Sequence, residues 1–349
     1  MVPENNKKQT NFLLIDADAV DPDNPVLTAL AGLLFPEHKI RLLLSGRPVD
    51  ETVTKEKFPK PCAEWFQEGN PARSRQLQVR NAARFVAFCE RFGVELRVYD
   101  GGIAPKTLVP HWVHKDETVI FGDTPEDAET NSRLRTRQEL ADEIMAAENP
   151  VIYLITGGPE TGNHLFFTEH PECMPFVQEE IGMLANWGAG SLMDLGGGRS
   201  TLQQFNVACD PIAARWSLIE APWPVLLVTT ETTKQPDICF GSLDALRAAL
   251  PDTDVAAAIV DLYKVWWDTA NLANRGGIII YDLAPLFALD EILRDQIFQV
   301  TRVSIDQVTD KGEVYMTPTD VMTNRWATQP ELQPDGAELY LRTFHNLCL

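Results

Sequence analysis

NFLLIDADAVDPDNPVLTALAGLL, residues 11–34, is the most informative segment of this 349-residue chain. Its apolar run FLLI (12–15) predicts a buried β-strand over 11–18. The residues PVLTALAGLL then predict a helix over 25–34, with Asn24 as the N-cap and Pro25 at the first position. A buried strand followed closely by a helix is typical of α/β proteins.

The same alternation continues along the chain. Apolar runs predict further strands over 39–46, 94–102, 150–158, 222–231 and 276–282. Helices are expected over 80–93, 125–148 and 242–250. Near-continuous apolar strands that alternate with helices predict a doubly wound, mostly parallel sheet. We interpret 11–349 as a single domain of this class, with a loop insertion at 48–78 and a small β-element at 300–326.

The charge balance excludes some partners. Fifty acidic and 30 basic side chains give a formal net charge of −20, which would repel nucleic-acid phosphates and anionic lipid. The sequence has no apolar run near the ~20 residues that span a bilayer. Its six cysteines include no CxxC pair, which favours free thiols in a reducing compartment. The first ten residues lack the apolar core of a secretory signal, so we expect a cytoplasmic, soluble protein.

Acidic residues gather where predicted strands end. In doubly wound sheets, ligands bind beyond the carboxyl ends of the strands. The acids at two such ends are Asp16, Asp18, Asp21, Asp23 and Asp282, and a third strand ends in Thr156-Gly157-Gly158. Carboxylates crowded at one sheet edge need a cation, and oxygen ligands alone favour calcium or magnesium. The alternative is that these are solvated loop acids and helix caps, with Asp21 only a turn residue before Pro22.

Segments from about residue 11 to 345 resemble, in the right order, the calcium-dependent nucleoside hydrolases. IDADAVDPDNPVLTALAGLL (15–34) resembles their signature DxDPGxDDAxA, and RNAARFV (80–86) and VELRVYDGG (94–102) resemble the helix and strand that follow. LITGGPETGN (154–163) is similar to their TGPLTN turn, and IYDLAPLFAL (280–289) to HDPLAVA. LMDLGGGRSTLQQFNVACDPIAA (192–214) resembles MGG…GN…AEFN…DPEAA. The resemblance implies a nucleoside-hydrolase fold and hydrolysis of an N-glycosidic bond.

The resemblance also implies roles for individual residues. Its calcium ligands would be Asp18, Asp23, Asp282 and the backbone carbonyl of Thr156, and Asp16 would support them. Asp18 would also act as the general base that takes a proton from water. Asn206 would bind the ribose. By analogy with the family, the protein would form a dimer or tetramer.

Departures from the family pattern fall at the sugar and leaving-group positions. Pro22 replaces the first aspartate of the DD pair, although Asp21 would substitute if the loop were shifted. Gln204 replaces the glutamate of AEFN, and Tyr281 the histidine of HDPL. Arg47 lies near the position where the family has an asparagine after its second strand. Either Gly198 or Arg199 takes the place of the asparagine in the family's GN motif.

These departures leave three hypotheses open. The first is a divergent calcium-dependent N-ribohydrolase that acts on a nucleoside or nucleotide-like substrate. The second is a protein of the same fold that binds a ribosyl ligand, such as a nucleotide or ADP-ribose, without efficient turnover. The third is a structural subunit. Arg47 and Arg199 would suit a phosphate-bearing ligand, or they are solvated loop residues. Tyr281, with an ordinary pKa of about 10, is a poorer acid than histidine.

Overall fold

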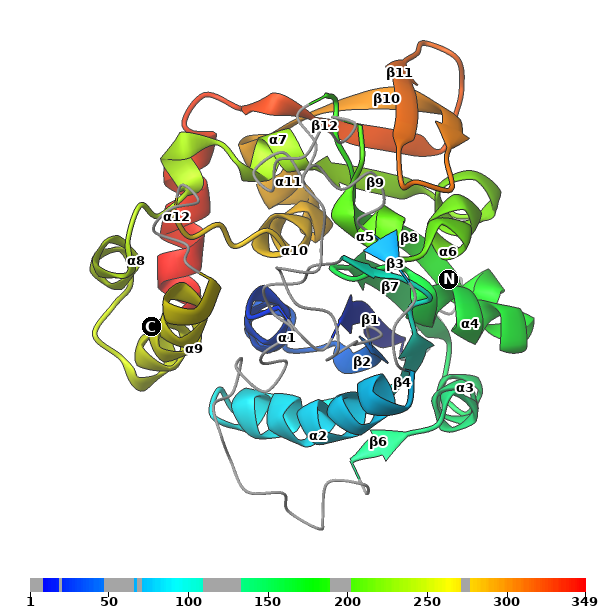
Figure 1. Ribbon diagram of the computed structural model, residues 1–349, viewed down its shortest axis with the longest axis horizontal. Helices are drawn as coiled ribbons and strands as arrows, with labels where there is room; N and C mark the ends of the chain where they lie inside the picture. Colours follow the sequence, from blue (N-terminus) through cyan, green and yellow to red (C-terminus); the bar gives the residue numbers. More distant parts are fainter. Residues whose placement is uncertain are drawn as a thin grey trace, which may run out of the picture.

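A ten-stranded sheet lies at the centre of the protein, with helices on both of its faces (Figure 1). The computed structural model describes residues 9–18, 21–46, 66–67, 71–108, 133–188, 202–270 and 277–349. The strand order is β11-β10-β12-β9-β8-β7-β1-β2-β4-β6. All neighbouring strands pair in parallel except β10, which is antiparallel to both β11 and β12. The mostly parallel sheet predicted from the sequence is therefore confirmed.

The strands of this sheet are β1 (Thr10–Asp18), β2 (Lys39–Gly46), β4 (Arg97–Ile103), β6 (Leu134–Arg135), β7 (Pro150–Thr156), β8 (Val177–Ala185), β9 (Val225–Thr229), β10 (Phe298–Val308), β11 (Val314–Pro318) and β12 (Arg325–Leu332). Two short strands, β3 (Phe66–Gln67) and β5 (Thr107–Leu108), form a separate antiparallel pair. The element expected at 300–326 is thus the antiparallel end of the main sheet.

The helices are α1 (Asp23–Leu34), α2 (Pro71–Glu90), α3 (Arg137–Met145), α4 (Thr161–Glu169), α5 (Phe205–Cys209), α6 (Pro211–Arg215), α7 (Thr230–Thr233), α8 (Leu243–Ala249), α9 (Asp254–Ala270), α10 (Leu283–Leu289), α11 (Glu291–Ile297) and α12 (Gly336–Leu347). Shorter turns are the 3-10 helices η4 (Pro171–Phe176) and η7 (Pro236–Ile238) and the π-helix η6 (Trp216–Glu220).

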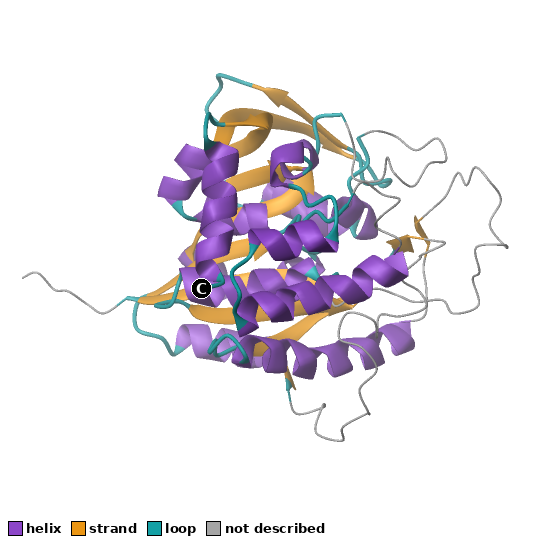
Figure 2. Ribbon diagram, turned by 90° about the vertical axis from the view of Figure 1, so that its left-hand side faces the viewer, coloured by secondary structure: helices purple, strands orange, loops and turns teal. Residues whose placement is uncertain are grey.

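Alternate residues of β1 enter two hydrophobic cores, one on each face of the sheet. Leu13 and Ile15 belong to a core with α1, α2, α9, α10 and α12, whereas Phe12 and Leu14 belong to a core with α3 and α4. Figure 1 shows α9 and α12 on one side of the strands and α3 and α4 on the other. Figure 2 views the first of these helical layers in front of the sheet. This two-sided burial is the reason β1 is apolar at every position from Phe12 to Ile15.

Several expected boundaries were wrong. No strand forms over the described part of 276–282, where Ile278 makes only an isolated bridge to Phe240 and Asp282 precedes α10. The helix expected at 80–93 begins at Pro71, so the predicted loop at 48–78 overlaps its first two turns. The polar run at 71–78 hides this start, although Leu77 and Gln78 are buried. Much of the rest of that predicted loop lies outside the described residues.

Other predictions need smaller corrections. Asn24 is not the N-cap of α1; it lies inside the first turn, and Pro22 takes the cap position. Within the described part of 125–148, only Arg137–Met145 is helical. Strand β8 was missed, because Glu179 and Glu180 interrupt its apolar pattern.

Five cysteines are free thiols, of which Cys89, Cys173, Cys209 and Cys348 are buried; Cys62 lies outside the described residues. Among the helices that the structure describes, none combines the length and apolar character needed to cross a membrane.

Glu143 of α3 ties the amino-terminal ends of β2 and β4 together. Its carboxylate accepts hydrogen bonds from the Arg41 guanidinium and the Tyr99 hydroxyl, and Arg97 lies 3.2 Å away. Burial alone would raise the pKa of Glu143, but the hydrogen bonds from Arg41 and Tyr99 and the charges of Arg41 and Arg97 lower it to about 2. An acid with a lowered pKa stabilises the fold above its unfolded-state pKa.

We therefore predict that Glu143→Gln lowers the free energy of unfolding by on the order of 2 kcal/mol at pH 7. The difference from wild type should shrink as the pH falls from about 4.5 towards 2, where the wild-type carboxylate takes up its proton. Urea denaturation at pH 7 and pH 3 measures both values. A difference that stays constant between the two pH values would contradict the assignment.

Candidate active site

The carboxyl ends of β1, β2 and β7 meet at one edge of the sheet. Asp16 pairs in register with Thr156 across β1 and β7, and Asp18 pairs with Ser45 across β1 and β2. The backbone N–H groups of Gly157 and Gly158 both donate to the Asp16 carbonyl, at 2.9 and 3.1 Å. These bonds hold the TGG turn against the end of β1. The three strand ends therefore form a fixed frame for the side chains at this edge.

Asp18, Asp23 and Asp282 come together at this edge, and all three are buried. Asp18 ends β1, Asp23 begins α1 and Asp282 takes the N-cap position of α10. Burial raises the pKa of Asp23 well above its usual value, and the negative charges of Asp21 and Asp18 raise it further. The pKa of Asp282 is also raised well above its usual value, first by burial and then by the negative charges of Asp23, Asp21 and Asp18. These carboxylates are therefore close enough to repel one another in a medium of low polarity.

The donor chemistry of this group suits a hard cation. Asp23 Oδ1 and Asn24 Oδ1 are buried and accept no hydrogen bond from the part of the chain that the structure describes. Two unsatisfied oxygens among buried carboxylates are costly unless a cation compensates them. However, no group of three or more His, Cys, Asp or Glu side chains among the described residues is arranged as a metal-binding cluster. In chemical type and burial these acids suit a hard cation, but their side chains alone form no metal-binding cluster among the described residues.

A second group of buried acids comprises Asp16, Glu160 and Glu180, and the sequence did not reveal its two glutamates. Asp16 accepts hydrogen bonds from the Asn163 backbone at 2.8 Å and from Ser45 at 3.2 Å. Burial raises the pKa of Asp16 to about 7, opposed by these bonds and aided by Glu180. The pKa of Glu160 is also raised, first by burial and then by the charge of Glu180. Hydrogen bonds from Asn163 and Ser45 therefore fix the Asp16 carboxylate near the end of β1.

Asn163 connects the second group of acids to the TGG turn. Its side-chain amide donates to Thr156 Oγ1 and to Glu160 Oε2, both at 3.1 Å. Glu180 instead accepts bonds from Ser217 and Trp223, each at 2.7 Å. The only signal in the sequence for these buried acids is the pair Glu179-Glu180 within an apolar segment, a pattern that surface strands also show.

Gln204 and Asn206 lie beside the same turn. The Asn206 amide donates to the carbonyls of Gly157 and Met183, each at 3.2 Å. Gln204 caps α5, because its Oε1 accepts from the Val207 N–H at 3.0 Å while its Nε2 donates to the Met183 carbonyl at 2.8 Å. A glutamate could make the first bond but not the second, which gives a structural reason for glutamine at this position.

Of the other residues predicted for the site, the structure describes only Tyr281 and Asp21. Tyr281 is partly buried against the core next to Asp282, and Asp21 is partly buried before α1. Arg47, Gly198 and Arg199 lie outside the described residues.

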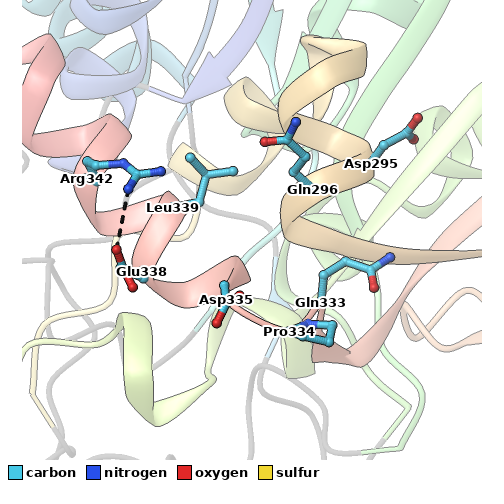
Figure 3. Close-up of a pocket in the computed structure, with 8 residues that line it drawn as sticks. All are labelled: Asp295, Gln296, Gln333, Pro334, Asp335, Glu338, Leu339 and Arg342. Carbon is cyan, nitrogen blue, oxygen red and sulfur yellow. Dashed lines mark hydrogen bonds and ion pairs between the residues drawn. The ribbon is translucent and has the colours of Figure 1, made fainter.

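A separate open cavity of about 550 Å³ lies between α11 and α12 (Figure 3). There Arg342 pairs with Glu338 at 3.4 Å, and none of the aspartates of the sheet edge lines the cavity.

Comparison with solved structures shows which proteins share this fold. An inosine-guanosine nucleoside hydrolase superimposes with a TM-score of 0.64 at 14% identity, covering 97% of this chain and 98% of that one. A purine-preferring ribonucleoside hydrolase from Gardnerella vaginalis gives 0.61 at 15% identity, covering 98% and 99%. The type III effector protein XopQ, solved with adenosine diphosphate ribose, gives 0.56 at 12% identity, covering 98% and 93%. At these identities the likeness concerns the fold.

The sequence itself carries the family relationship. No curated protein sequence matches the chain significantly. The family model described as inosine-uridine preferring nucleoside hydrolase matches residues 70–333. The match leaves out the acidic segment at 15–34 but includes Thr156, Asn206 and Asp282. Because this model matches well over half of the chain, the protein belongs to the inosine-uridine preferring nucleoside hydrolase family.

Proposed function

We propose that this protein is a divergent calcium-dependent N-ribohydrolase, which cleaves the N-glycosidic bond of a nucleoside or nucleotide-like substrate. The observation that carries the proposal is the burial of Asp18, Asp23 and Asp282 together at the ligand-binding edge of the sheet. Membership of a family of metal-dependent hydrolases that generally bind calcium supports it.

In this proposal Asp18, Asp23, Asp282 and the Thr156 carbonyl would hold the calcium, which would lower the pKa of water at the site. Asp18 would take the proton of the attacking water as the general base. The carboxylates also place negative charge near the sugar, which favours an oxocarbenium-like transition state. Asn206 holds a ribose hydroxyl, and Tyr281 donates a hydrogen bond or proton to the leaving base.

The second candidate function is binding of a nucleotide or ADP-ribose-like ligand with little or no turnover. The capping role of Gln204 favours it, because the side chain that replaces the family's glutamate is already engaged by the protein. A lost charged hydrogen bond costs on the order of 1.5–3 kcal/mol, so the substituted sugar site would catalyse poorly. The shared fold with XopQ is consistent with this function. A purely structural subunit is the third hypothesis.

The deciding experiment incubates the calcium-loaded protein with inosine, guanosine, adenosine, uridine, AMP and ADP-ribose. Chromatography then measures free base, and a reducing-sugar assay measures the released ribose. Equal amounts of base and sugar from at least one compound would support the hydrolase. Binding of a ligand without any released base would support the binding protein instead.

A separate prediction concerns the choice of substrate. By the family resemblance, Arg47 and Arg199 would add positive charge near the predicted pocket, and charge-assisted bonds to phosphate are about twice as strong as neutral ones. We expect AMP and ADP-ribose to bind more tightly than adenosine, with the difference lost in Arg47→Ala or Arg199→Ala. Calorimetry on the calcium-loaded protein measures the three affinities. Equal or weaker binding of AMP would return both arginines to the role of solvated loop residues.

Three broader features belong to the proposal as well. We propose one domain over 11–349, a cytoplasmic location and a homo-oligomer, either a dimer or a tetramer. The free thiols of the described cysteines support a reducing compartment. Sedimentation analysis of the purified protein would give the oligomeric state.

A further inference from the structure

Asn24 is a buried amide in the first turn of α1, beside the proposed calcium ligands. It has no exposed surface. Its Nδ2 donates to the Asp18 carbonyl at 3.1 Å, which fixes the direction of the amide group. Turning the amide over would place its oxygen against that carbonyl oxygen, with two acceptors facing each other. The observed orientation is therefore the one that the backbone of β1 selects.

This orientation leaves Asn24 Oδ1 without a donor. The oxygen is buried and accepts no hydrogen bond from any residue that the structure describes. The nearby backbone N–H groups are already used, because Gly157 and Gly158 both donate to the Asp16 carbonyl. The Asp282 N–H donates to the Asp23 carboxylate. An amide oxygen buried in this way is destabilising unless something positive or protic faces it.

Asn24 Oδ1 faces the same small space as Asp282. A Cβ atom placed on Gly157 would lie 2.8 Å from Asn24 Oδ1 and 2.6 Å from Asp282 Oδ2. Two oxygen acceptors thus converge on the side of Gly157 that carries no side chain. Asp23 Oδ1, from the preceding residue of α1, is likewise buried without a hydrogen bond from the described chain. Converging oxygens of this kind are the ligands that calcium prefers, and amide carbonyls are among them.

We propose that Asn24 Oδ1 is a further oxygen ligand of the cation site, beyond the three aspartates and the Thr156 carbonyl. This inference rests on the proposed function. It explains why the buried Asn24 side chain donates one hydrogen bond through Nδ2 while its Oδ1 accepts none from the described residues. A neutral fifth protein oxygen would complete the set without adding to the repulsion.

Terbium luminescence tests the ligand directly, since the lifetimes in H₂O and D₂O count the water molecules on the bound ion. Tb³⁺ replaces Ca²⁺ at oxygen sites, and displacement by excess Ca²⁺ shows that both occupy one site. We expect Asn24→Ala to gain roughly one bound water and to bind Ca²⁺ at least roughly tenfold more weakly. Asn24→Asp keeps a side-chain oxygen and should retain the wild-type water count.

Thr28→Ala is the matched control. Thr28 is buried one turn further along α1, and its hydroxyl donates to the Asn24 carbonyl at 2.8 Å. Its loss perturbs the helix without touching the proposed ligand, so the water count should equal that of wild type. Circular dichroism of each variant in chelator separates folding from metal binding. If Asn24→Ala does not fold, a raised water count in Asn24→Asp would count against the inference.

The outcomes separate this inference from the proposed function. Tight Tb³⁺ binding by wild type with an unchanged water count in Asn24→Ala would overturn the role of Asn24 and leave the calcium site standing. Absence of Tb³⁺ and Ca²⁺ binding by the folded wild-type protein would overturn both.

Discussion

Replacing Asp18 with asparagine should reduce the release of base from the preferred substrate at least ~10²-fold, the lower range for loss of a general base. The substitution keeps the shape of the side chain but removes its negative charge and its basicity. Asp18 is fully buried at the end of β1, where its charge also raises the pKa values of Asp23 and Asp282. The variant should therefore fold, because it relieves repulsion among the three carboxylates.

Initial rates with calcium in excess measure this effect, and thermal unfolding in chelator checks the fold. Ser45→Ala is a suitable control, since Ser45 pairs with Asp18 across β1 and β2 and its hydroxyl bonds instead to Asp16. Equal rates in Asp18→Asn and wild type would show that the measured activity arises elsewhere or from a contaminant.

A second large effect is expected from Gly157→Ala. The added Cβ would lie 2.6 Å from Asp282 Oδ2 and 2.8 Å from Asn24 Oδ1, so one or both side chains must move. Calcium binding should fall sharply, and activity should drop ~10²-fold, as expected when site groups are displaced by about 1 Å. Calorimetric titration with calcium and the rate of base release measure the two consequences.

Gly241→Ala is the matched control for this prediction. A Cβ at Gly241 meets no atom within 4 Å, so the same chemical change should leave calcium affinity and activity unchanged. If Gly157→Ala binds calcium as tightly as wild type, then Asn24 and Asp282 do not converge on the cation.

The sheet could be predicted from the sequence because its signals are local. β1 and β2 bury nearly every side chain, so their apolar runs identify them without knowledge of their neighbours. Asp282 shows the limit of this reasoning. GGIIIYD has the composition of a strand, yet Asp282 precedes α10, and Ile278 contacts Phe240 through a single bridge. Burial in the core, which a helix or an irregular segment also provides, explains the apolar residues there.

The site was predictable where strand ends supply it and not where distant residues complete it. Asp18 and Asp23 belong to one short segment, so their proximity follows from the sequence. Asn24 was expected to cap α1, because asparagine is a common N-cap. Its actual environment depends on Gly157 and Asp282, which lie far along the chain. Glu160 was missed for a similar reason: only the folded chain brings it next to Glu180.

The most direct test of calcium-dependent hydrolysis is a calcium titration of chelator-treated protein during turnover of its best substrate. The proposal predicts no base release without calcium and a rate that saturates when about one ion is bound per chain. The same titration of Asp18→Asn should show little release at any calcium concentration. A rate that persists in chelator, or no release from any tested nucleoside or nucleotide with calcium bound, would contradict it.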